Sequence, residues 1–391
     1  MDLAPQNPSS LFGPHFVDEE FRVGSSRESP EDCARPATVL TFSTGDRKFS
    51  VADVVEAGWF RGDLHARWEE FICGTAAERL AGEKGLEPRT EVLQSLSETF
   101  RTEHDLITSE ETESWLAARS LTLNDFCDYC HRQYWRRHIT HPSPPAKTNY
   151  ANAAPGDRQL FIKDILFSGR FDALARGLGW RIAVSVAAGL SEKPSSDILE
   201  SERTRFFQRS GSQPEQLPGL LDLIGRDQGW FESLLELEAG YRRHCDQLLT
   251  PKNRALTLAV LRLSLTEFDV KMMDLESEDA AREAFLCLDT DGVAMEALAA
   301  QEGCLIEKRR VLLEELPEQF QQRFLSSDPG QTLLLVEKDS RYQVCRVLDK
   351  MQPTLSSQKV LERVDHELLA SHFGNLAAKH IVWLIGRDPP A

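Results

Sequence analysis

Two segments of the chain resemble each other, and this internal repeat constrains the fold more than any other feature. Residues 45–60 read GDRKFSVADVVEAGWF and residues 156–171 read GDRQLFIKDILFSGRF, with six of sixteen positions identical at an offset of 111 residues. Apolar residues after the first segment recur at spacings of three and four, so the repeat predicts a helical module of about 100 residues that occurs twice. The alternative is that two unrelated helical segments share turn residues by chance. A second sequence similarity, at a slightly shorter offset, relates Trp115, Leu116, Ser120 and Phe126 to Leu220, Leu221, Gly225 and Phe231.

Composition excludes several classes of partner. The chain has 391 residues, which is enough for two or three domains of ordinary size. Its 62 acidic and 45 basic residues give a net charge of −17, and this charge opposes binding to a phosphate backbone or an anionic lipid surface. We therefore expect no nucleic-acid partner. The first residues lack the pattern of an export signal and no long apolar run occurs, so we expect no membrane insertion and a cytoplasmic location.

The cysteines are sparse, as is usual for reduced thiols in a reducing compartment. Cys127, Cys130 and His131 nevertheless match the Cys-x-x-Cys-His pattern of covalent c-type haem attachment. Such attachment normally takes place outside the cytoplasm, and a structural zinc site needs four ligands that this segment does not supply. We expect no cofactor and no metal, and leave open whether these three residues bind anything.

After the second helical module the pattern changes to a small mixed module. Its apolar runs and turn residues predict the order β-α-α-β-α-β-β, followed by a long amphipathic helix over residues 357–384. The predicted strands are residues 268–275, 310–313, 332–336 and 342–348. The expected fold class is α+β, with mostly helical, duplicated modules and one small α+β domain. The predicted boundaries are 1–37 for a flexible arm, 38–140 for the first helical module, 141–155 for a linker, 156–254 for the second helical module, 255–352 for the α+β domain and 353–391 for the C-terminal helix.

Residues 316–350, LPEQFQQRFLSSDPGQTLLLVEKDSRYQVCRVLDK, resemble the closing half of a parvulin-type (PpiC) peptidyl-prolyl isomerase domain. Residues 45–55 and the helices behind them are similar to the N-terminal chaperone region of SurA-like proteins. The resemblance implies that the C-terminal helix returns to pack on the helical modules. Within this family, the chain looks most like the divergent members that are associated with bacterial peptide maturation and export. The positions that carry the parvulin likeness are Pro317, Glu318, Phe320, Pro329, Gly330, Val336, Tyr342, Val347 and Lys350.

The resemblance implies a catalytic pocket with two histidines on central strands, but this chain departs from it. The first histidine position falls on Lys271 or Met272, depending on a one-residue choice of alignment, and the second falls on Gln343. Ser340 and Arg341 replace an aromatic residue and a glycine, and the segment before residue 313 is short for the loop of the far wall. We therefore assign no catalytic residue and expect a degenerate parvulin-like domain.

A peptide-binding groove is the functional interpretation of the remaining positions. Phe320 and Phe324 would supply aromatic walls, and Gln343 an amide that pairs with peptide backbone. The alternatives are that both phenylalanines belong to the core, that Gln343 faces water, and that Cys345 is a buried small hydrophobe. The candidate peptide-binding residues are Met272, Phe320, Phe324, Tyr342, Gln343 and Cys345.

Three functions are compatible with these residues. The first is a chaperone-like accessory protein that holds a precursor or unfolded peptide for modification or export. The second is an active peptidyl-prolyl cis-trans isomerase. The third is a structural subunit of a peptide-maturation complex. The expected partners are a peptide or unfolded protein and, beyond it, a peptide-modifying enzyme or an exporter.

Overall fold

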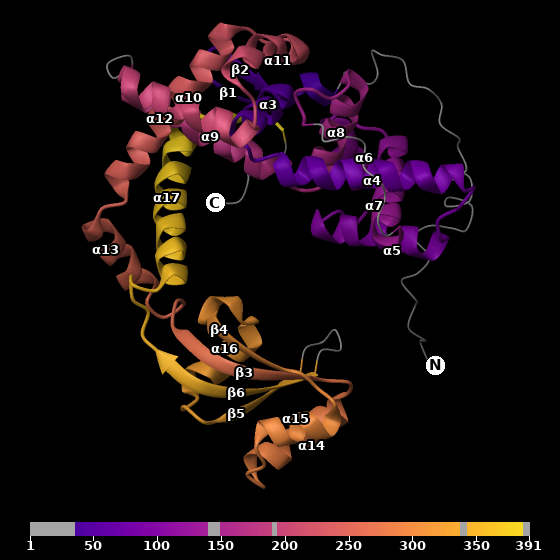
Figure 1. The fold of residues 1–391 in the computed structure, drawn as a ribbon, viewed down its shortest axis with the longest axis vertical. Coiled ribbons are helices and arrows are strands. Elements are labelled where there is room, and N and C mark those ends of the chain that lie inside the picture. The colour runs from indigo at the N-terminus through magenta and orange to yellow at the C-terminus, as the bar shows by residue number, and fades with distance from the viewer. Residues whose placement is uncertain (1–35, 140–148, 190–193, 337–341, 386–391) are drawn as a thin grey trace, which may run out of the picture. The chain divides into compact units, whose positions relative to one another are not determined.

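The computed structural model describes residues 36–139, 149–189, 194–336 and 342–385. The fold is α+β, as expected, with many helices and two small antiparallel sheets (Figure 1). The chain divides into two compact units. Unit 1 contains the residues up to His244 and from Phe373 onward, and unit 2 is Cys245–His372. In the described segments no helix has both the length and the apolar character needed to cross a bilayer.

Unit 1 contains two consecutive sets of five helices. Helices at the same place in each set have similar lengths. In chain order, the helices of the first set have 11, 19, 14, 10 and 16 residues, and those of the second have 13, 18, 15, 8 and 21 residues. Most of both predicted helical modules therefore lies in this unit. The first set is α3 (Val51–Arg61), α4 (His65–Glu83), α5 (Thr90–Glu103), α6 (Ser109–Ala118) and α7 (Leu123–His138); the second is α8 (Pro155–Phe167), α9 (Phe171–Ala188), α10 (Ser196–Ser210), α11 (Leu217–Ile224) and α12 (Gln228–Leu248).

The first helix of each set packs into the other set. Phe60 of α3 lies against Phe206 of α10 and Phe231 of α12, with ring centroids 5.1 and 5.5 Å apart. Phe167 of α8 lies against Phe100 of α5 and Phe126 of α7, with centroids 5.9 and 5.8 Å apart. The two helical sets consequently share one hydrophobic core, in which all these rings are buried.

These equivalent phenylalanines correct the offset of the repeat. Phe60 and Phe167 differ by 107 positions, and the other two pairs differ by 106 and 105. At the offset of 111 expected from the sequence, Gly45 of a hairpin turn would match Gly156 in the first turn of α8. The error is four residues, about one helical turn, and such a slip leaves the same face of a helix apolar.

A turn conserved between the sets supports the corrected correspondence. Ser120 and Gly225 both have positive φ, +52° and +70°. In each set the next amide donates to a buried leucine carbonyl at 2.9 Å, that of Leu116 in α6 or Leu221 in α11. The same helix-ending geometry, with a hydrogen bond between residues five positions apart, therefore occurs at the positions that the second sequence similarity relates.

A three-stranded sheet completes unit 1. The expected hairpin forms β1 (Leu40–Thr44) and β2 (Arg47–Ser50), and Ser50 then caps α3 together with Asp53. The third strand, β7 (Val382–Trp383), corrects the sequence analysis, which extended the last helix to residue 384. Helix α17 (Gln358–His380) ends earlier because the chain pairs with β1, where the Trp383 ring packs on Phe42.

Unit 2 has the expected order of strands and helices after α13 (Pro251–Leu261). Its antiparallel sheet has the strand order β4-β3-β6-β5. The apolar contacts put α14 and α15 on one face and α16 on the other (Figure 1). The elements are β3 (Glu267–Leu275), α14 (Glu278–Asp289), α15 (Met295–Glu302), β4 (Ile306–Leu312), α16 (Glu318–Ser326), β5 (Thr332–Val336) and β6 (Tyr342–Met351).

We predict that Phe60→Ala and Phe167→Ala destabilise the same unfolding transition of unit 1, each by about 3–5 kcal/mol, because each empties a buried site in the shared core. All seven tryptophans lie in unit 1, so urea unfolding followed by tryptophan fluorescence reports on this unit alone. Leu223→Ala is the control, since this side chain is 51% exposed. Separate transitions for the two helical sets would contradict the shared core.

Candidate functional site

A pocket of about 570 Å³ lies on one face of the unit 2 sheet. This volume is in the range typical of pockets that hold small ligands or a short stretch of chain. Among the described residues, its lining includes strands, the turn before α16, and α16 itself. The lining residues are Met272, Asp274, Leu275, Glu307, Arg309, Glu315, Leu316, Pro317, Phe320, Leu335, Tyr342 and Gln343.

Strand register explains why the pocket opens at this end of the sheet. Met272 of β3 lies opposite Cys345 on β6 and Glu307 on β4, so these side chains share one face. Further along the same face, α16 covers the sheet, and its Phe324 packs on Phe268 with ring centroids 5.4 Å apart. The end of β3 contributes the buried Met272 and the exposed Asp274 to the lining of the pocket.

The same alternation places on opposite faces of the sheet the two residues that the resemblance offered for its first histidine position. Lys271 lies on the opposite face, where its ammonium pairs with Glu296 of α15. Met272 is 5% exposed and lines the pocket. The position that the resemblance assigns to an imidazole therefore holds a thioether, which has no proton to transfer.

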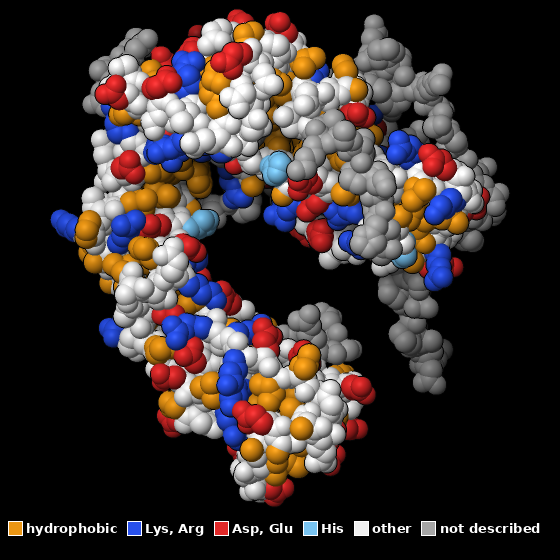
Figure 2. Space-filling model, viewed as in Figure 1, with side chains coloured by type: hydrophobic (Ala, Val, Ile, Leu, Met, Phe, Trp, Pro, Cys, Tyr) orange, Lys and Arg blue, Asp and Glu red, His pale blue; other side chains and the backbone are white. Residues whose placement is uncertain are grey.

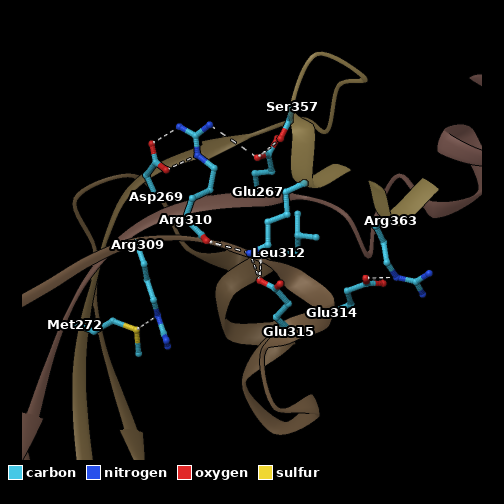
Figure 3. A network of polar contacts seen from close by, with 11 residues as sticks. Glu267, Asp269, Met272, Arg309, Arg310, Leu312, Glu314, Glu315, Ser357 and Arg363 are labelled. Carbon is cyan, nitrogen blue, oxygen red and sulfur yellow. Dashed lines mark hydrogen bonds and ion pairs between the residues drawn. The ribbon is translucent and has the colours of Figure 1, made fainter. Parts of the chain in front are cut away.

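Arg309 lines the pocket and carries a positive charge. Figure 3 shows its side chain directed at the Met272 sulfur. Its Nε donates to the Met272 sulfur at 3.1 Å, and within the described residues it forms no ion pair. Its neighbour Arg310 lies on the other face of β4 and binds Asp269 at 2.7 Å. The guanidinium of Arg309 therefore retains donors that a bound molecule could use.

Gln343, at the second histidine position, also lines the pocket. Its Nε2 donates to Asp274 Oδ1 at 2.5 Å, which fixes the amide across the two central strands. Tyr342 and Phe320 line the same pocket, so the structure brings together four of the six candidate residues. That these residues contact a peptide remains a prediction.

Phe324 and Cys345, the other two candidates, lie beneath the pocket. Both are fully buried in the core between the sheet and α16. Burial raises the pKa of the Cys345 thiol to about 12, so it stays protonated at neutral pH. Their burial agrees with the alternative that assigned them to the core.

The sequence analysis missed the charged lining of this pocket. Asp274 lies two residues beyond Met272 on the same face, and Glu307 and Arg309 precede the buried Val311 at the same spacing. The period of two along each strand could have found them. For β4 this period could not reveal Glu307 and Arg309, because the predicted strand began at residue 310.

The Cys127–His131 segment lies on α7 in unit 1. Cys130 is buried, and burial raises the pKa of its thiol to about 12, whereas Cys127 is only half-buried. Throughout the described part of the chain, no group of three or more His, Cys, Asp or Glu side chains is arranged to hold a metal ion.

The chain matches no protein-family model and no curated protein sequence. It is similar in fold to the peptidylprolyl isomerase PrsA from Bacillus cereus, at 11% identity and TM-score 0.34, covering 56% of this chain and 84% of that one. PrsA from Bacillus anthracis matches at 15% identity and TM-score 0.30, covering 53% and 94%. A structure from work on two SurA-like chaperones of Campylobacter jejuni, PEB4 and Cj1289, matches at 9% identity and TM-score 0.19, covering 56% and 89%. At such values these similarities establish neither an activity nor a substrate for this chain.

We predict that Cys130 and Cys345 resist alkylation in the native protein. At about pH 8 a thiol with a pKa near 12 is a thiolate for only about one part in 10⁴, and burial also blocks the reagent. Iodoacetamide labelling followed by peptide mass spectrometry measures this. The half-buried Cys287 and Cys304 serve as internal controls and should react first. Rapid native labelling of Cys345 would mean that the thiol is accessible from the pocket.

Proposed function

We propose that the protein is a chaperone-like accessory protein whose unit 2 pocket holds an extended peptide without isomerising it. The observation that carries the proposal is a pocket that combines apolar walls with polar donors on its floor. The half-buried Leu275 and Tyr342 can pack on peptide side chains, while Gln343 and Arg309 can pair with peptide carbonyls. Burial of apolar surface would supply affinity at about 25 cal/mol per Å², before the peptide's ordering is subtracted.

The chemistry of the lining favours holding over conversion. Isomerisation must overcome an amide rotation barrier of about 20 kcal/mol, and an enzyme lowers it only through contacts that strengthen in the twisted state. Among the described residues that line the pocket there is no histidine, and the nearby thiol of Cys345 is buried and protonated. The domain is accordingly proposed to be a degenerate parvulin.

An active isomerase is the second candidate, and one observation favours it. Gln343 and Arg309 both present nitrogen donors to the same pocket, and such donors can stabilise a carbonyl oxygen during amide rotation. A purely structural subunit is the third candidate, and it requires no affinity for peptides.

The proposal includes a cytoplasmic location and a second protein that receives the held peptide, either a modifying enzyme or an exporter. Within the described segments the seven cysteines form no disulfide with one another, which suits a reducing compartment. The high negative charge of the chain disfavours anionic surfaces as alternative partners. The client would be a precursor peptide or an unfolded protein.

Binding and isomerisation can be measured separately on the full-length protein. Fluorescence anisotropy with proline-containing peptides should show saturable binding at micromolar concentrations, and Tyr342→Ala should weaken it about fivefold to tenfold by removing part of the wall. Exchange NMR on the same peptides should show unchanged cis-trans rates. Leu286→Ala on α14 is a matched control, because its side chain is 57% exposed and lies on the helix that covers the opposite sheet face.

The outcomes distinguish the three candidates. Accelerated exchange at catalytic amounts of protein would select the isomerase. An absence of peptide binding, together with stable association with a modifying enzyme, would select the structural subunit. Binding that is lost equally in Leu286→Ala and Tyr342→Ala would move the site away from this pocket.

A further inference from the structure

We propose that the unit 2 pocket selects peptides that carry a lysine or arginine side chain, and that Asp274 and Glu307 receive this cation. The inference rests on the proposed function, because it specifies which peptides the pocket holds. It is drawn from the charges of the lining, which contains the carboxylates of Asp274, Glu307 and Glu315 and the single guanidinium of Arg309.

Asp274 and Glu307 lie on adjacent strands and point to the same face. Glu307 is directly opposite Met272 in the β3–β4 ladder, and Asp274 is two residues further along β3, so the two carboxylates are diagonal neighbours. Both side chains are exposed at the pocket. A cationic group placed between them would approach both carboxylates at once.

Neither carboxylate has a cationic partner within the described residues. In the described part of the chain, Asp274 accepts a side-chain hydrogen bond from the neutral amide of Gln343 alone, at 2.5 Å. Asp274 and Glu307 thus each retain acceptor sites for a ligand. The hydrogen bond from Gln343 also restrains Asp274, which reduces the side-chain entropy lost when a cation binds.

The third carboxylate is already neutralised. Glu315 accepts from Lys359 Nζ at 2.5 Å and from the backbone amide of Leu312 at 2.9 Å. The remaining charges of the lining are two carboxylates and Arg309, which leaves one net negative charge. The charged residues at 337–341, which lie outside the described residues, are two acids and two bases and therefore sum to zero.

This balance favours a basic occupant over an acidic one. An acidic side chain could pair with Arg309, but it would enter beside two carboxylates that repel it. A basic side chain meets two unpaired acceptors, while Arg309, held against the Met272 sulfur, stays available for a backbone carbonyl. The surface of unit 2 visible in Figure 2 carries positive and negative side chains mixed with hydrophobic ones, so it offers no large patch of a single charge. We therefore attribute the selection of basic peptides to the pocket.

The experiment compares three fluorescent peptides with one shared Phe-Pro core and two flanking positions that are lysine, glutamine or glutamate. Titrated with the full-length protein, the lysine peptide should bind about tenfold tighter than the glutamine peptide, with the glutamate peptide weakest. Because exposed charges are screened, the preference should shrink when salt is raised from about 0.05 to 0.5 M.

Variants that remove charge test whether Asp274 and Glu307 cause the preference for lysine peptides. Asp274→Asn with Glu307→Gln should abolish the lysine preference and leave the affinity for the glutamine peptide within about twofold, since both changes preserve side-chain size. The matched control, Glu283→Gln with Asp291→Asn, removes the same net charge in and after α14, which covers the other sheet face, and should leave the preference intact.

The outcomes separate this inference from the proposed function. Equal affinities for all three peptides, a preference for glutamate, or a lysine preference that survives Asp274→Asn with Glu307→Gln would overturn the inference while peptide holding stands. Failure of every peptide to bind would overturn the proposed function, and the inference with it.

Discussion

The antiparallel ladder of β3 is the constraint on which the architecture of unit 2 depends. This strand pairs on both sides, with β4 and with β6, and its successive side chains point to opposite faces. Met273 enters the core under α14 and α15, while Val270 and Met272 face α16 and the pocket. A slip of one residue would exchange the two sets and place Lys271 in the pocket, so burial on both faces fixes the register and thereby fixes the chemistry of the site.

Sequence patterns predicted those elements whose own residues carry the signal. The bounds of β5 (Thr332–Val336) agree with the expected strand because an apolar run follows a Pro-Gly turn. The start of β4 was placed four residues late, because its exposed half, Glu307 to Arg310, is charged, as suits the edge of a sheet. The choice between Lys271 and Met272 could not be made from the sequence, since it depends on pairing with strands far along the chain.

The repeat in unit 1 illustrates a different limit of sequence reasoning. Helical periodicity tolerates a shift of one turn, so residue identities alone supported an offset of 111 where the packed phenylalanines give 105 to 107. Nor does periodicity show which set a helix packs into. Because α3 packs into the second set and α8 into the first, the two sets share a single core, and each set buries phenylalanines against a helix from the other. Unit 1 is therefore expected to unfold cooperatively although its sequence reads as two modules.

The residues at the two positions that the parvulin resemblance gives to histidine also affect what the pocket can recognise. An imidazole at Met272 or Gln343 would place a titrating group beside Asp274 and compensate part of its charge near neutral pH. A thioether and an amide do not ionise, so neither residue adds a charge that varies with pH to the lining, and the amide of Gln343 orients the carboxylate of Asp274. A pocket that discriminates by charge needs ligating groups that remain in one protonation state, whereas a proton relay needs groups that change state. The lining found here suits the first requirement, and this links the proposed holding role to the proposed selection of basic peptides.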